Sequence, residues 1–145
     1  TAFLNRKAAD FKMTAMFKPV DELKRSKKEL DAKGNLNAKE KQELFLYEIL
    51  IEMHYRNIEL MQIDIYKSEA TSFTIEDGKI RMPLIAMDGL GESVAVNVVN
   101  ERKKGEFLSM EDLVKRTKLN KTVMDLLKTY NCVPELSATN QQTLF

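Results

Sequence analysis

The short run Met87-Asp88-Gly89-Leu90-Gly91-Glu92-Ser93 constrains the fold of this chain more than any other feature of the sequence. Two glycines flank Leu90, and a helix-patterned run, VAVNVV, follows at 94–99. Glycine allows a positive φ and lets another chain approach the bare backbone. A helix that begins here presents unpaired N–H groups and the positive end of its dipole. Phosphate is the ligand that fits this geometry best.

This arrangement resembles the hairpin of a helix-hairpin-helix element, which holds a nucleic-acid backbone without reading the bases. Cations follow one helix length downstream, at Arg102 and Lys103. The alternative is a plain connector between two helices. If the resemblance holds, we expect the DNA-binding residues of this unit to be Gly89, Leu90, Gly91, Glu92, Ser93, Arg102 and Lys103.

The second half of the chain is predicted to be an internal repeat. The first unit has a short helix near 84–87, the hairpin 88–91 and a helix over 92–103. The second unit begins with a capping box at Ser109 and continues as a helix to Arg116. Asn120 is then the expected N-cap of an apolar-patterned helix. Because its hairpin lacks glycine, this unit should hold phosphate mainly through Lys118 and Lys121, with Asn120 beside them.

The first half is predicted to be helical. Pro19 suits the first turn of a helix that runs to Ala32, and Gly34 is a suitable stop. Asn37 and Glu40 match a second capping box, for a helix that runs to about Tyr55. Its stretch 44–53 is apolar almost all round, so we expect burial on most sides.

Between 57 and 83 the pattern changes to short β-type pieces, at 63–66, 72–75 and 79–82, with a hairpin signal at Asp77-Gly78. The expected fold class is therefore mainly α with a small β element. A helical N-terminal half is followed by a tandem helix-hairpin-helix domain and a flexible tail.

Composition limits where a nucleic-acid site can lie. The chain has 23 Lys and Arg against 22 Asp and Glu, so any such site must be a local patch. Residues 101–128 contain eight basic and five acidic side chains, which suits a few phosphate contacts. One cysteine, no membrane-length apolar run and no signal pattern indicate a reducing, cytoplasmic setting. Because the chain begins at Thr1, we expect a fragment of a longer polypeptide.

No catalytic, metal or cofactor site is expected in this chain. Its acids are dispersed and alternate with Lys and Arg, which is typical of solvated helix faces. His54 has no second ligand at metal-binding spacing, so we expect a core histidine. Cys132 has no histidine partner nearby and is interpreted as a buried thiol.

The last five residues carry two apolar side chains after a polar stretch. An exposed Leu-Phe pair at this place favours a pocket on a partner. The pentapeptide is similar to the one by which bacterial replication proteins hold the sliding clamp. We expect clamp binding by Gln141, Gln142, Thr143, Leu144 and Phe145. The alternative is that the tail folds back on its own domain.

With both features in view, the chain resembles the C-terminal end of the PolC-type bacterial DNA polymerase III alpha chain. The matching stretches are IDIYKSEA at 63–70, IAMDGLG at 85–91, KGEFLS at 104–109, KLNKT at 118–122 and QQTLF at 141–145. The resemblance implies that 1–60 end the polymerase fingers, 61–136 bind duplex DNA and 137–145 bind the clamp. It also implies that the carboxylates holding Mg²⁺ lie in a palm that precedes this stretch.

The sequence departs from the family pattern at three places. Asn57 stands where the family usually has Gly, and Asp88 stands where the family often has Pro. Gln142 stands where the family usually has Leu. Asp88 should weaken phosphate binding slightly, and Gln142 should weaken binding to the clamp.

The leading hypothesis is a processivity module of a DNA polymerase that binds the duplex backbone and tethers the enzyme to the sliding clamp. A stand-alone helix-hairpin-helix repair accessory is a second class, and it would need catalytic residues that are not visible. A structural protein-interaction domain is the third class, in which the Gly-Leu-Gly turn only connects helices.

Overall fold

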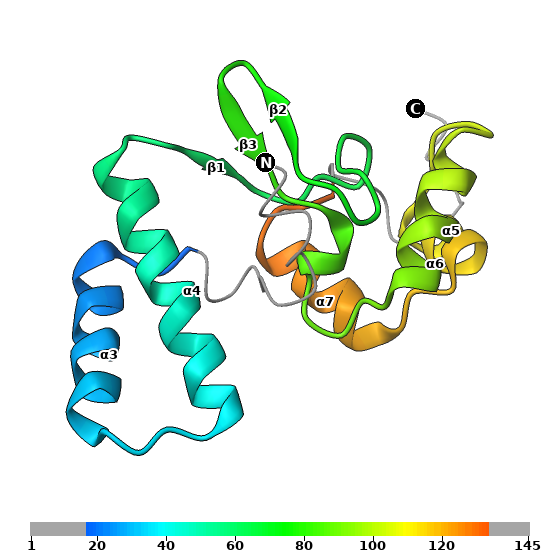
Figure 1. Ribbon diagram of the computed structural model, residues 1–145. Helices are drawn as coiled ribbons and strands as arrows, with labels where there is room; N and C mark the ends of the chain where they lie inside the picture. Colours follow the sequence, from blue (N-terminus) through cyan, green and yellow to red (C-terminus); the bar gives the residue numbers. More distant parts are fainter. Residues whose placement is uncertain (1–16, 134–145) are drawn as a thin grey trace.

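A computed structural model describes residues 17–133 of the chain (Figure 1). Helices α3 (Val20–Lys33) and α4 (Ala38–Tyr55) lie side by side at one end of the molecule. Helices α5 (Glu92–Arg102), α6 (Met110–Thr117) and α7 (Lys121–Thr129) gather at the other end. Three short strands lie between the two groups, so the mainly α class with a small β element is confirmed.

Local signals set the two N-terminal helices. Pro19 is the N-cap of α3 rather than its first residue, and Gly34 ends that helix with a φ of 74°. Asn37 caps α4 by accepting a hydrogen bond from the Glu40 N–H at 2.9 Å. Lys33 and Glu40 then form an ion pair at 2.7 Å across the connecting turn. The predicted starts and stops of both helices are therefore confirmed to within a residue or so.

The prediction that α4 is buried on most sides is wrong. Leu46, Tyr47, Leu50 and Met53 are buried, but Phe45 and Tyr55 are 45% and 63% exposed. The reason is that α3 covers one side, and no other helix of the described region packs broadly against α4. His54 is exposed as well, against the expectation of a core histidine, and its ring meets that of Tyr55 edge to face.

The β element is a three-stranded sheet in the order β1-β3-β2. Strands β2 (Thr74–Glu76) and β3 (Lys79–Arg81) form the predicted hairpin, with Ile75 opposite Ile80. Strand β1 (Leu60–Met61) pairs parallel to β3. The buried Arg81 guanidinium donates to both carboxylate oxygens of Glu76 and to the Gln62 carbonyl, and this joins the three strands.

The strand predicted at 63–66 does not form, because side chains bind the backbone there. The Asp64 carboxylate accepts from the Tyr66 and Lys67 N–H groups at 2.8 and 3.2 Å. The Asp64 N–H donates to Ser68 Oγ at 2.9 Å. Such local hydrogen bonds replace the ladder that a strand would need.

The repeat predicted in the second half is present in outline. A 3₁₀ helix, η2 (Leu84–Ala86), leads into the glycine hairpin and α5. Ser109 caps α6 by accepting from the Asp112 N–H, and Asn120 caps α7 by accepting from the Val123 N–H. The expected domain boundary at 60–61 falls within β1, and it stays a prediction.

One buried cluster supports these elements. It contains side chains from α3 and α4, the sheet region, and all three C-terminal helices. Leu84, Ala86, Ala95, Val98, Leu113 and Leu127 are fully enclosed. Both units of the repeat therefore share a core, as back-to-back packing requires.

Candidate nucleic-acid interface

The glycine hairpin is built on a tight turn from Met87 to Leu90. The Leu90 N–H donates to the Met87 carbonyl at 3.1 Å, and Gly89 has a φ of 82°. This is the third turn position, which a type II turn reserves for glycine. Gly89 is thus needed for its backbone conformation.

The other side of the turn is anchored in the core. Met87 and Leu90 are buried, at 0% and 3% exposure. A β-carbon placed on Gly89 would lie 3.6 Å from Val123 Cγ2, so the hairpin of the first unit rests on α7 of the second. Leu90 was predicted to bind DNA, but the structure uses both its side chain and its N–H inside the protein.

Gly91 begins α5 in an open position. It has an extended backbone with a φ of −79°, and a β-carbon there would meet nothing within 4 Å. The N-cap residue of α5 makes no side-chain hydrogen bond, whereas serine and asparagine cap α6 and α7. The first turn of α5, with exposed Glu92 and Ser93, is therefore a bare helix start open to a ligand.

Ser93 and Lys118, which are 25 residues apart in sequence, line the same cleft of about 650 Å³ between α5 and α6. Asn97 sets this arrangement, because its Nδ2 donates to the Arg116 and Thr117 carbonyls at 3.3 and 3.1 Å. The end of α6 is thereby held beside the start of α5. The structure thus brings together predicted residues from both units.

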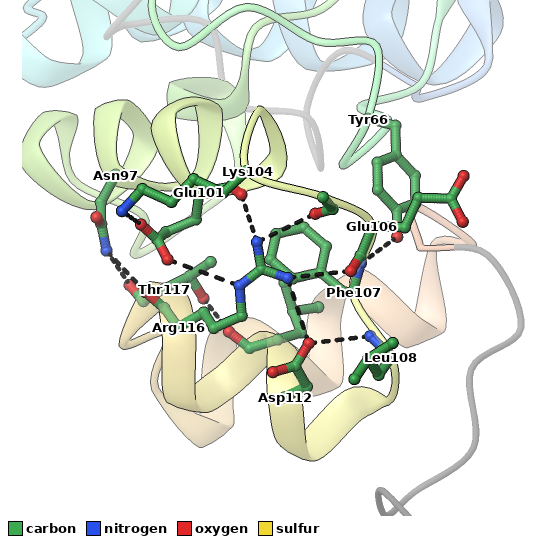
Figure 2. Close-up of polar contacts among 12 residues, drawn as sticks. Tyr66, Asn97, Glu101, Lys104, Glu106, Phe107, Leu108, Asp112, Arg116 and Thr117 are labelled. Carbon is green, nitrogen blue, oxygen red and sulfur yellow. Dashed lines mark hydrogen bonds and ion pairs between the residues drawn. The ribbon is translucent and has the colours of Figure 1, made fainter. Parts of the chain in front are cut away.

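Arg116 lines this cleft, and its guanidinium reaches the connection between α5 and α6 (Figure 2). Its guanidinium donates to the Glu101, Gly105 and Glu106 carbonyls. It also lies 4.5 Å from the centroid of the Phe107 ring. The connection from α5 to α6 is therefore fastened to α6 at several points.

The two carboxylates that line the cleft, Glu101 and Asp112, are each paired with cations of the protein. Glu101 accepts from Lys104 Nζ and lies 3.6 Å from Arg116 Nε, and these cations lower its pKa. Asp112 accepts from the Leu108 N–H and from Arg116, and both interactions lower its pKa. Because each carboxylate is paired with a cation of the protein, it repels an anionic ligand less than an unpaired carboxylate would.

Arg102, which was predicted to bind DNA, makes several contacts inside the protein. Its Nη1 donates to the Ile65 and Ser68 carbonyls at 3.1 and 2.6 Å, and its side chain is only 12% exposed. It fastens the loop between β1 and β2 to the end of α5, about 16 Å along the helix from Gly91. Lys103 is exposed, but it lies at the same distant end.

The second hairpin presents exposed lysines. Lys118 ends α6 in the left-handed region, with a φ of 61°, and its N–H donates to the Val114 carbonyl. Asn120 uses its side-chain oxygen to cap α7, and Lys121 follows as the first residue of that helix. Lys118 and Lys121 are both exposed.

Two lysines of this surface were not predicted from the sequence. Lys115 lines the cleft with Ser93 and Lys118, and Lys128 lies on α7 seven residues after Lys121. A spacing of seven places two side chains on the same face of a helix, and this could have identified Lys128.

Three further observations concern residues 17–133. Cys132 is buried, and burial raises the pKa of its thiol to about 12. No three acidic, His or Cys side chains in this range gather as metal ligands would. None of the helices described here combines the length and apolar character of a membrane span. The clamp-binding residues 141–145 lie outside the described range.

Comparisons with known proteins agree with this geometry. The family model described as helix-hairpin-helix motif matches residues 57–143. The chain is 39% identical to a protein named DNA polymerase III PolC-type from Oceanobacillus iheyensis, over 99% of this chain. Proteins of the same name from Clostridium perfringens and Bacillus subtilis are 39% and 36% identical, over 100% and 99% of the chain. The chain spans about a tenth of the length of each of these relatives.

Proposed function

Because the chain belongs to the helix-hairpin-helix family, we propose that it binds the sugar-phosphate backbone of double-stranded DNA without reading the bases. The observation that carries this proposal is the uncapped start of α5 at Gly91, which opens onto free space. Backbone N–H groups at such a site complement phosphate oxygens of any sequence.

The proposed contacts come from both units of the repeat. Gly91, Glu92 and Ser93 offer backbone N–H groups, while Gly89 and Leu90 shape the turn and anchor it. Lys118 adds positive charge at the cleft that Ser93 lines, and Lys121 is an exposed cation at the start of α7. Arg102 is left out of this set because its guanidinium donates to two carbonyls of the protein.

The relatives extend the proposal to a whole protein. We infer that the chain is part of a DNA-directed DNA polymerase of the bacterial cytoplasm, since its relatives carry the name DNA polymerase III PolC-type. In that protein, residues 61–136 would hold the duplex, and residues 1–60 would complete the fingers. A Mg²⁺-dependent site for nucleotidyl transfer would lie in another part of the polypeptide.

Residues 137–145 would tether the polymerase to the sliding clamp. The sequence QQTLF supplies two apolar side chains for a pocket and a glutamine for its rim. Once the clamp encircles DNA, such a tether raises the effective concentration of the polymerase at the duplex. Neither contact then needs to be tight alone.

The test compares this chain with a variant that lacks residues 141–145. Removal should abolish binding to the isolated sliding clamp, measured by surface plasmon resonance, and leave duplex affinity unchanged in fluorescence anisotropy. A variant with the same five residues in scrambled order is the matched control, and it should behave like the deletion. Clamp affinity that survives the deletion would refute the tether, and absence of duplex binding at low salt would refute the DNA-binding role.

A further inference from the structure

The two units of the repeat use their cations differently. At the end of the first unit, Arg102 donates to the Ile65 and Ser68 carbonyls, and Lys104 pairs with Glu101. Lys103 is the one cation of this stretch that forms no ion pair with a carboxylate of the described residues. The first unit therefore has little positive charge left for a ligand.

The second unit keeps its lysines available. Lys115, Lys118, Lys121 and Lys128 are all exposed. Within residues 17–133, none of the four forms an ion pair, whereas Lys67, Lys79 and Lys104 each do. Arg116 alone among the cations of α6 and α7 is committed to carboxylates.

The four lysines flank α6 on both sides. Lys115 and Lys118 line the cleft that contains Ser93. Lys115 also lines a second cleft of about 510 Å³ between α6 and α7, together with Lys121 and Lys128. Glu111 and Asp125 border this second cleft, so its rim carries three positive and two negative charges. Lys115 thus connects the two clefts.

We propose that the two units divide the work of binding duplex DNA. The first hairpin contributes backbone N–H groups, and the second unit contributes the ionic contacts through Lys115, Lys118, Lys121 and Lys128. This inference rests on the proposed DNA binding, and it adds Lys115 and Lys128 as phosphate contacts.

The spacing of the lysines suits a single DNA strand. Lys121 and Lys128 are seven residues apart on one helix, or about 10 Å along its axis. A length of about 10 Å along the duplex axis carries about three phosphates of each strand, so both lysines can reach phosphates when α7 lies along the duplex. Lys115 and Lys118 continue the same positive surface past the end of α6 toward the first hairpin.

The two kinds of contact respond differently to salt. A lysine that neutralises a phosphate releases a counterion, which contributes about −0.9 to the slope of log affinity against log salt. A backbone N–H carries no net charge and releases no counterion. Loss of a lysine should therefore flatten the slope, whereas obstruction of the hairpin should lower affinity at every salt concentration.

The experiment measures that slope for this chain on an arbitrary duplex, by fluorescence anisotropy over a series of salt concentrations. The double variant K115A/K128A should have a slope shallower by about 1.8. Alanine favours helix, so both sites should stay folded, which circular dichroism would check. The matched control is K28A/K41A, which removes from α3 and α4 two exposed lysines that form no ion pair within residues 17–133, and it should keep the original slope.

A third variant, Gly91→Val, tests the other half of the division. The extended backbone at this position accepts valine, and a β-carbon there would meet nothing within 4 Å. Its side chain would stand where phosphate approaches, so affinity should fall about tenfold with the slope unchanged.

The outcomes separate the inference from the proposed function. If the unaltered chain binds duplex steeply with salt but K115A/K128A keeps its slope, the division of work is wrong and DNA binding stands. The division is also wrong if Gly91→Val changes the slope as much as the lysine variant does. If the unaltered chain shows no salt-dependent duplex binding, the proposed function fails and this inference fails with it.

Discussion

Lys118 has a backbone conformation that residues with a β-carbon seldom adopt. Its φ of 61° lies in the left-handed region, where glycine or asparagine usually ends a helix. Asn57 has a similar φ of 56°, but asparagine tolerates this region better. A lysine at a strained position beside the Ser93 cleft fits the proposed contact to phosphate.

Replacing Lys118 by glycine should therefore separate stability from binding. We expect Lys118→Gly to raise the free energy of unfolding by about 1 kcal/mol, measured by urea denaturation, because the strain is relieved. Duplex affinity should nonetheless fall, with a salt slope shallower by about 0.9. Asn57→Gly is the control, since it should not reduce affinity. A Lys118→Gly variant that binds duplex as well as the original chain would remove Lys118 from the interface.

At the scale of helices and turns, the sequence predicted those features that depend on residues close together in the chain. The caps at Asn37, Ser109 and Asn120 and the turn at Gly89 each depend on residues three or four positions away. Long-range partners could not be predicted in this way. The Arg102 side chain binds carbonyls 34 and 37 residues earlier, and no local pattern indicates that choice.

Arg116 also binds residues that are distant in the sequence, and it makes the free energy of unfolding depend on pH. The Glu101 and Asp112 carboxyls have lowered pKa values in the folded protein, partly because of Arg116. They bind fewer protons folded than unfolded, so their stabilising effect is present above their ordinary pKa near 4. It is lost as the pH falls through the lower folded values.

Arg116→Met should accordingly lower the urea midpoint at about pH 7, and the gap to the original chain should narrow toward about pH 3. Arg25→Met is the matched control, because Arg25 is exposed on α3 and forms no ion pair with a described residue. A gap that stays constant across this pH range would show that Arg116 acts only through the carbonyl groups that it binds.

The whole molecule places two hairpins on one surface of a shared core. The first hairpin rests on α7 through Gly89 and Val123, and α5 is fixed to α6 through Asn97 and Arg116. These contacts hold the start of α5 beside Lys118 before any ligand arrives. Such a preformed surface needs little ordering on binding, which suits the proposed contact to the DNA backbone.

The direct test is a map of backbone amide chemical shifts as unlabelled duplex is added to this chain in ¹⁵N-labelled form. The amide signals of Gly91, Glu92 and Ser93 should shift most, followed by those around Lys118 and Lys121, for duplexes of unrelated sequence. If those signals stay fixed while another face of the molecule responds, the hairpin does not hold the DNA backbone.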